Sequence, residues 1–188
     1  MIINKNPWSP ELTAKCCFAG EDGKLLIQLF RKLKVEATEF YVTHLVKFCP
    51  PDFKPVLRAS WVKDAMHLLY QEIKIVQPKY ILCLGSDTSK ALLGSSASVS
   101  DMEGRVETLR YNVAYSSKDV ESHWREAQVM TVVHPKSVIR DQSAERQLEN
   151  GLARFAALLK GVDVGKRETV DHRIVDNLAQ LLEQLLEI

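Results

Sequence analysis

The segment from Val132 to Asp141 carries the side chains of this chain that are best suited to chemistry. An apolar run, Val129 to Val133, leads into His134-Pro135. Proline fixes its own φ and biases the preceding residue toward an extended backbone, so His134 is predicted at the carboxyl end of a strand. Ligands of open α/β sheets bind outside the carboxyl ends of the strands. The imidazole is therefore expected at a ligand site.

The residues that follow add a hydroxyl, two cations and an apolar wedge, and they are Lys136, Ser137, Val138, Ile139 and Arg140. Such a set suits a loop that grips a nucleic-acid backbone and pushes an apolar side chain into the base stack. The alternative is an ordinary strand-ending turn with solvated charges. This segment by itself favours neither interpretation.

The composition bounds the possibilities. At 188 residues the chain suits one domain with a substantial core. Its formal net charge is +1, so any nucleic-acid binding must come from a local cationic face. The apolar runs are too short to cross a bilayer and no cleavable signal is recognisable, so we expect no membrane association.

The cysteines do not form a metal-binding pattern. Cys16 and Cys17 are adjacent, and no C-x-x-C pair occurs. Cys83 lies in an apolar run, where a free thiol acts as a small hydrophobe. We expect all four cysteines, with Cys49 the fourth, to be reduced in a cytosolic-type compartment, and we expect no metal.

The elements that must position His134 alternate along the chain. Strand-like runs are expected at residues 1–3, 40–46, 79–84, 106–113 and 129–133, and helical patterns at 23–33, 56–76, 86–93 and 143–159. The polar residues 115–128 are interpreted as an insertion. Alternation of strands and helices predicts an α/β sandwich with a mainly parallel sheet.

Several segments occur in a characteristic order. They are 17–26 (CFAGEDGKLL), 41–47 (YVTHLVK), 78–85 (PKYILCLG) running into 91–94 (ALLG), 102–105 (MEGR) and the His134 segment. Over residues 4–160 this succession resembles the uracil-DNA glycosylase superfamily, most closely the branch typified by thermophile iron–sulfur enzymes. The resemblance implies a three-layer α/β/α sandwich with a central four-stranded, mainly parallel sheet. It also implies hydrolysis of the N-glycosidic bond of a flipped uracil in DNA.

The resemblance implies roles for four residues around the base. Phe18 matches the phenylalanine that stacks on uracil; its structural alternative is a core residue beside the first helix. His134 would donate to a uracil oxygen in the transition state. His44 occupies the position of the uracil-reading asparagine, and it could instead face solvent or the following helix. Asn6 resembles an asparagine that other branches use to position water.

The resemblance also implies contacts with DNA. Gly85 and Ser86 match the loop that lets the backbone approach a phosphate; alternatively they form only a strand-to-helix turn. Phosphate contacts are expected from Lys136, Ser137 and Arg140, whereas Val138 and Ile139 would enter the gap left by the flipped base. For Lys136, an ordinary solvated position is the alternative.

The chain departs from the family pattern in its first motif and its cysteines. The motif falls on Asn4 to Trp8, where both glycine positions are occupied by other residues and Pro7 is the firm match. An amide such as that of Asn6 cannot act as a general base, so a slower reaction is expected. Cys49 lies one residue beyond its expected place and Ala65 stands where a later cysteine would align. We therefore expect no iron–sulfur cluster and no other cofactor.

The last part of the chain suggests a larger context. Residues 163–188 are expected to form a linker and an amphipathic helix that follow a glycosylase-like domain at 1–162. Residues 170–182 resemble the short strand and helix that lead into a 3′–5′ exonuclease domain. The implied partner, besides uracil-containing or single-stranded DNA, is a DNA polymerase or exonuclease domain of the family A type, in the cytoplasm of a bacterium or a phage-infected host.

Three functions follow as hypotheses. The first is an active uracil-DNA glycosylase. The second is a catalytically weakened module that binds uracil or DNA for a replicative polymerase. The third is a protein-interaction domain that keeps the fold without binding DNA. Fold alone does not choose among them.

Overall fold

The computed structural model describes residues 1–51, 56–94, 105–114, 123–162, 164 and 171–174. Its strands are β1 (Ile2–Asn4), β2 (Val42–His44), β3 (Tyr80–Leu84), β4 (Val106–Asn112), β5 (Trp124–Val132) and β6 (Asp171–Ile174). Its helices are α1 (Ser9–Ala14), α2 (Glu21–Lys32), the 3-10 turn η1 (Ala37–Glu39), α3 (Ala59–Val76), α4 (Ser86–Leu93), α6 (Pro135–Arg140) and α7 (Ser143–Leu159). The predicted alternation of strands and helices is confirmed.

The strands form one sheet in the order β2-β1-β3-β5-β4-β6. The first four are mutually parallel, as predicted. The prediction of four strands was too low, because β4 pairs antiparallel with β5 and β6 pairs parallel with β4. Within the described residues the sheet therefore has six strands, and four of them form the mutually parallel part.

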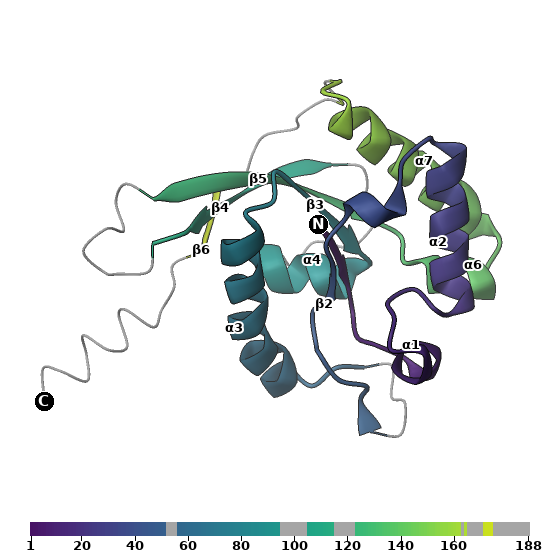
Figure 1. The fold of residues 1–188 in the computed structure, drawn as a ribbon, viewed down its shortest axis with the longest axis horizontal. Helices are drawn as coiled ribbons and strands as arrows, with labels where there is room; N and C mark the ends of the chain where they lie inside the picture. The colour runs from purple at the N-terminus through teal and green to yellow at the C-terminus, as the bar shows by residue number, and fades with distance from the viewer. Residues whose placement is uncertain (52–55, 95–104, 115–122, 163, 165–170, 175–188) are drawn as a thin grey trace, which may run out of the picture.

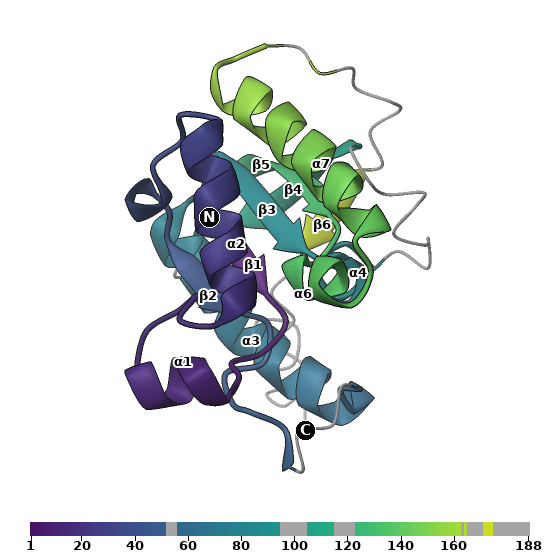
Figure 2. The same ribbon diagram turned by 90° about the vertical axis from the view of Figure 1, so that its right-hand side faces the viewer.

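Helices cover both faces of the sheet, which confirms the three-layer sandwich (Figures 1 and 2). Alternate residues of a strand point to opposite faces. In β3, Ile81 and Cys83 join the apolar cluster that includes residues of α3 and α4. Leu82 and Leu84 join the cluster that includes residues of α2 and α7. Burial on both faces explains why this strand is a continuous apolar run in the sequence.

The interpretation of residues 115–128 as an insertion was wrong for its last part, because β5 begins at Trp124. The first residues of β5 pair with β4, and pairing with β3 begins only at Gln128. Arg125 and Glu126 are exposed there, so this stretch lacks the apolar character on which the sequence interpretation depended. Residues 115–122 lie outside the described part of the chain.

The carboxyl-terminal region is described only in part. Residues 171–174 form β6, the strand at the edge of the sheet next to β4. The amphipathic helix was expected at residues 174–188; Ile174 instead ends β6, and residues 175–188 lie outside the described part of the chain. Within the described chain, none of the helices combines the length and the apolar character needed to cross a membrane.

Candidate active site

The carboxyl ends of the four parallel strands place four polar or glycine positions along one edge of the sheet. His44 ends β2, Asn4 ends β1, Gly85 follows β3 and His134 follows β5. Asn4 and His44 are register partners. A ligand site at this edge is the arrangement expected of open α/β sheets.

His134 is held by one hydrogen bond on each ring nitrogen. It is the N-cap of α6, where its Nδ1 accepts the backbone N–H of Lys136 at 3.0 Å. Its Nε2 lies 2.8 Å from Asn4 Oδ1. Because Nδ1 accepts, the proton of the neutral ring sits on Nε2, which donates to Asn4. The segment predicted as a turn is thus a short helix capped by the candidate catalytic side chain.

The electrostatic surroundings keep this imidazole neutral. Burial lowers the pKa of His134 from 6.5 to about 4, with the nearby charges of Lys136 and Lys5 adding to the effect and those of Asp22 and Glu11 opposing it. A neutral ring retains one N–H donor, so at pH 7 the Nε2–H remains available for a hydrogen bond.

Gly85 has a steric role in this arrangement. Its φ is +86°, in the left-handed region that favours glycine. A Cβ at residue 85 would lie 3.3 Å from His134 Cβ. Because β3 lies between β1 and β5, His134 must pass over Gly85 to reach Asn4. The glycine therefore permits the His134–Asn4 contact, beside the phosphate role expected from the sequence.

A cleft of about 440 Å³ opens beside these residues. Six of the residues singled out in the sequence line it: Gly85, Ser86, His134, Lys136, Ser137 and Arg140. Side chains that the sequence interpretation did not assign also contribute, among them Lys5, Trp8, Asp87 and Gln147. The structure therefore brings His134 and the expected phosphate-binding residues to one hollow.

Two cationic side chains of the cleft have identified partners. Lys5 Nζ forms an ion pair with Asp87 Oδ2 at 2.5 Å. Lys136 Nζ lies 3.4 Å from the centre of the Trp8 ring, a cation–π contact. Burial lowers the pKa of Lys136, and the like charge of Arg140 contributes in the same direction.

The two apolar residues of the expected wedge are placed differently. Val138 is buried at 7% exposure in the core cluster beneath α6, so its assignment to the wedge was wrong for this structure. Helix formation causes this, because successive side chains of a helix point to different faces. Ile139 is 53% exposed and remains available as a wedge.

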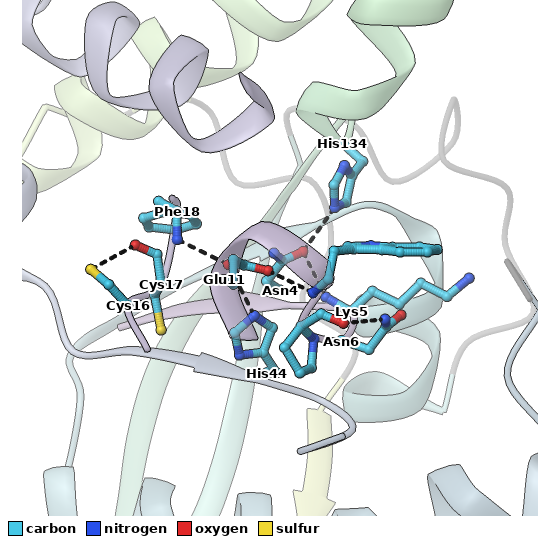
Figure 3. A network of polar contacts seen from close by, with 11 residues as sticks. Asn4, Lys5, Asn6, Glu11, Cys16, Cys17, Phe18, His44 and His134 are labelled. Carbon is cyan, nitrogen blue, oxygen red and sulfur yellow. Dashed lines mark hydrogen bonds and ion pairs between the residues drawn. The ribbon is translucent and has the colours of Figure 1, made fainter. Parts of the chain in front are cut away.

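Phe18 and His44 meet a third residue, Glu11, that the sequence interpretation missed (Figure 3). Glu11 Oε1 accepts the backbone N–H of Phe18 at 2.9 Å, and its Oε2 accepts that of Trp8 at 3.0 Å. His44 Nε2 lies 3.4 Å from Glu11 Oε1, within ion-pair distance when His44 is protonated. Ser9-Pro10-Glu11 carries the proline and acidic residue typical of a first helical turn, and this signal could have located Glu11.

The charge of Glu11 is stabilised although the side chain is 7% exposed. Burial raises the pKa of Glu11, but the neighbouring His44 side chain and the backbone N–H groups of Phe18 and Trp8 outweigh it and hold that pKa below its usual 4.5. The Glu11 carboxylate therefore contacts Phe18, the candidate stacking residue, His44, the candidate base reader, and Trp8 of the first motif.

The backbone of Phe18 is held in an unusual conformation. Its φ is +61°, rare for a residue with a side chain. A Cβ at Gly23 would lie 2.3 Å from the Phe18 Cα, so the glycine lets α2 pack directly on this backbone. The half-buried ring packs against the core beside α2, consistent with the structural alternative; the stacking role stays a prediction.

Asn6 is turned into the protein. The residue is 1% exposed, and its Nδ2 donates to the Pro7 carbonyl at 3.0 Å. Its Oδ1 is buried with no hydrogen-bond partner in the described part of the chain. A buried acceptor of this kind usually indicates an ordered water or a ligand.

The cysteines do not fit an iron–sulfur cluster. Burial raises the pKa of the Cys83 thiol to about 12, so it resists becoming a thiolate. Among the described residues, no three His, Cys, Asp or Glu side chains come together as a metal site.

Comparison with known proteins agrees with this geometry. The family model of the uracil DNA glycosylase superfamily matches residues 1–161. A type-4 uracil-DNA glycosylase of Pyrobaculum aerophilum is 27% identical over 155 residues, covering 82% of this chain and 75% of that protein. One of Sulfurisphaera tokodaii is 23% identical over 173 residues, covering 92% and 74%. A DNA polymerase of Bacillus phage SP01 is 22% identical over 162 residues, covering 86% of this chain but 16% of the polymerase.

Proposed function

The chain belongs to the uracil-DNA glycosylase superfamily, and from this premise we propose that it hydrolyses the N-glycosidic bond of a uracil flipped out of DNA. The observation that carries the proposal is the neutral His134 ring, whose Nε2–H is oriented by the Lys136 N–H on the opposite nitrogen. His134 is one of the residues that line the cleft, whereas Phe18, His44 and Asn6 are not among them.

The role proposed for His134 follows from the charge that develops in the reaction. When the C1′–N1 bond breaks, its electron pair moves to uracil, which leaves as an anion. A preorganised N–H donor near the uracil oxygen stabilises that charge more than it stabilises the neutral base. In the free protein Asn4 Oδ1 accepts this hydrogen bond, so uracil would have to replace Asn4 as the acceptor.

The remaining proposed roles follow the placement of the side chains. Phe18 would stack on the base and His44, oriented by Glu11, would contact its polar edge. Asn6 would hold a water through its unpaired Oδ1. At the cleft, Lys136, Ser137, Arg140 and the Gly85-Ser86 backbone would contact phosphates, with Ile139 entering the base stack.

Excision from a uracil-containing oligonucleotide tests the proposal directly. Alkaline cleavage of the product reports abasic sites, on single- and double-stranded substrates with enzyme in excess. We expect scission by the unaltered protein and a loss of about 100-fold or more in His134→Ala, the typical effect of removing one oxyanion donor. His67→Ala, an exposed histidine on α3, is the matched control. No scission on either substrate would refute catalysis.

One observation favours a second candidate, a weakened module that binds uracil-containing or single-stranded DNA. The His134 donor is already paired with Asn4, and the Asn6 amide cannot take a proton from water. Tighter binding to uracil-containing than to thymine-containing oligonucleotides, without product, would support this candidate. Equal binding to both, with a steep salt dependence, would indicate phosphate contacts alone. Absence of any DNA binding at low salt would favour a protein-interaction domain.

The context proposed for either activity is replication. We propose that residues 1–162 form the glycosylase-like domain and that 163–188 lead toward a DNA polymerase or exonuclease partner in a bacterial or phage-infected cytoplasm. The similarity to the phage polymerase supports this context. Co-purification of the full chain with a polymerase of its source, lost when residues 175–188 are deleted and β6 is kept, is the expected result.

A further inference from the structure

A hydrolytic reaction in this cleft needs a group that accepts a proton from water. The two asparagines of the first motif do not supply one, because Asn6 and Asn4 both carry amides and Asn4 Oδ1 already contacts His134 and the Lys5 N–H. Among the described residues that line the cleft, Asp87 is the only carboxylate. Asp87 is therefore the carboxylate available in the cleft to accept that proton.

Asp87 is held in the cleft from two sides. Its backbone lies in the first turn of α4, directly after the Gly85-Ser86 turn over which His134 lies. Its Oδ2 forms an ion pair with the Nζ of Lys5, the residue that directly follows β1. The Asp87 side chain is 53% exposed and the Lys5 side chain 20%, so the lysine anchors a carboxylate that water still reaches.

We propose that Asp87 is the general base of the reaction and that Lys5 is the residue that positions it; the inference rests on the proposed glycosylase function. Water attacks C1′ of the deoxyribose and forms the new C–O bond, while one of its protons passes to the Asp87 carboxylate. The C1′–N1 bond breaks, and its electron pair leaves with uracil, whose oxygen is hydrogen-bonded by His134. Protonated Asp87 then releases its proton to solvent.

The surrounding charges are compatible with a carboxylate close to DNA. Lys5, Lys136 and Arg140 all line the same cleft, and His134 is neutral there. These cations offset the repulsion between Asp87 and the phosphates. Lys5 also lowers the cost of holding a negative side chain beside the expected phosphate loop.

A purely structural role for Asp87 predicts different results. An acidic residue in the first helical turn stabilises the helix through its dipole, and an exposed ion pair adds little. On that account, removing the charge would alter stability slightly and leave the chemical step unchanged. Measuring the chemical step under single-turnover conditions, together with DNA affinity, separates the two roles.

The decisive variant is Asp87→Asn, which keeps the shape and removes the base. We expect the single-turnover rate on uracil-containing single-stranded DNA to fall about 100-fold or more, as is typical of general-base removal, while affinity for the same DNA changes less than about threefold. Asp87→Glu should recover part of the rate. Glu149→Gln is the matched control, since Glu149 is a partly exposed carboxylate paired with Lys32 at 3.2 Å and lies outside the cleft lining.

A substrate with a better leaving group distinguishes Asp87 from His134. 5-Fluorouracil is more acidic than uracil, so it needs less stabilisation of the departing anion. The loss of rate in His134→Ala should therefore be smaller on 5-fluorouracil DNA. The loss of rate in Asp87→Asn should stay the same, because this variant impairs activation of the attacking water and not departure of the base. Lys5→Met should lower the rate with the same persistence on 5-fluorouracil, since it releases the carboxylate from its position.

The outcomes separate the two proposals. If the unaltered chain cleaves and Asp87→Asn keeps its rate within about threefold, the assignment of Asp87 is overturned and the glycosylase function stands. If the unaltered chain does not cleave, both are overturned. If Asp87→Asn proves unfolded by circular dichroism, Lys5→Met decides: a normal rate overturns the inference, and a lowered rate that 5-fluorouracil does not restore supports it.

Discussion

Replacing His134 with asparagine tests the arrangement of the site without any assay of catalysis. Asparagine is a good N-cap, so its oxygen can accept the Lys136 N–H that His134 Nδ1 accepts. It does not titrate. Comparing the two proteins across pH therefore isolates the cost of charging the buried imidazole.

The sign and the size of the effect follow from the pKa of the folded state. Burial lowers the pKa of His134 from 6.5 to about 4, so between these values the unfolded chain binds a proton that the folded chain does not. Stability contributed by the neutral ring is complete above pH 6.5 and is lost as pH falls toward 4. Between about pH 7.5 and pH 5 the loss is about 2 kcal/mol.

Urea unfolding at these two pH values measures the effect. We expect the free energy of unfolding of the unaltered chain to fall by about 2 kcal/mol more than that of His134→Asn. Other titrating groups, including Glu11, are present in both proteins and cancel in the difference. Equal pH dependence of the two proteins would refute the description of His134 as a buried, neutral ring whose Nδ1 accepts a hydrogen bond.

Three further perturbations have expected outcomes. Gly85→Ala should lower the free energy of unfolding by about 1–3 kcal/mol, measured by urea titration, because residue 85 has φ +86° and its new Cβ would press on His134; an unchanged midpoint would contradict this steric role. Glu11→Gln should lower the free energy of unfolding by about 1–3 kcal/mol, because the glutamine NH2 group cannot accept the backbone N–H that one carboxylate oxygen accepts. A thermal melt like that of the unaltered chain would contradict this. Arg140→Gln should weaken binding to all DNA sequences alike and reduce the salt dependence of affinity by about one phosphate contact; a sequence-dependent loss in a fluorescence anisotropy titration would argue against phosphate binding.

The replacement of a family glycine by Trp8 has a simple structural account. Trp8 has φ −116° and ψ 171°, an extended conformation that any residue adopts. The indole lines the cleft and lies beneath the Lys136 ammonium group. The substitution therefore adds an aromatic wall to the cleft without straining the backbone of the first motif.

Local sequence patterns predicted the ends of helices and strands well where an apolar run was bounded by proline, glycine or a capping residue. The apolar run before His134-Pro135 located the end of β5, and Ser86 and Leu93 were the predicted limits of α4. The patterns gave wrong predictions where a strand segment was not apolar throughout, as at the start of β5, and where a helix was short, as in α6. The polar start of β5 was taken for an insertion, and the wedge residue Val138 lies inside because α6 turns it toward the core.

The sequence by itself determined the α/β architecture and the placement of a histidine, a glycine turn and a cationic segment at strand ends. These features depend on periodicity and on proline and glycine geometry, which act over a few residues. Only the tertiary structure decided which side chains meet: His134 with Asn4 across β3, Glu11 with Phe18 and His44, and Asp87 with Lys5. Except for Glu11 and Phe18, which are seven residues apart, these pairs lie far apart in the chain. They depend on strand order and register, which local patterns do not encode.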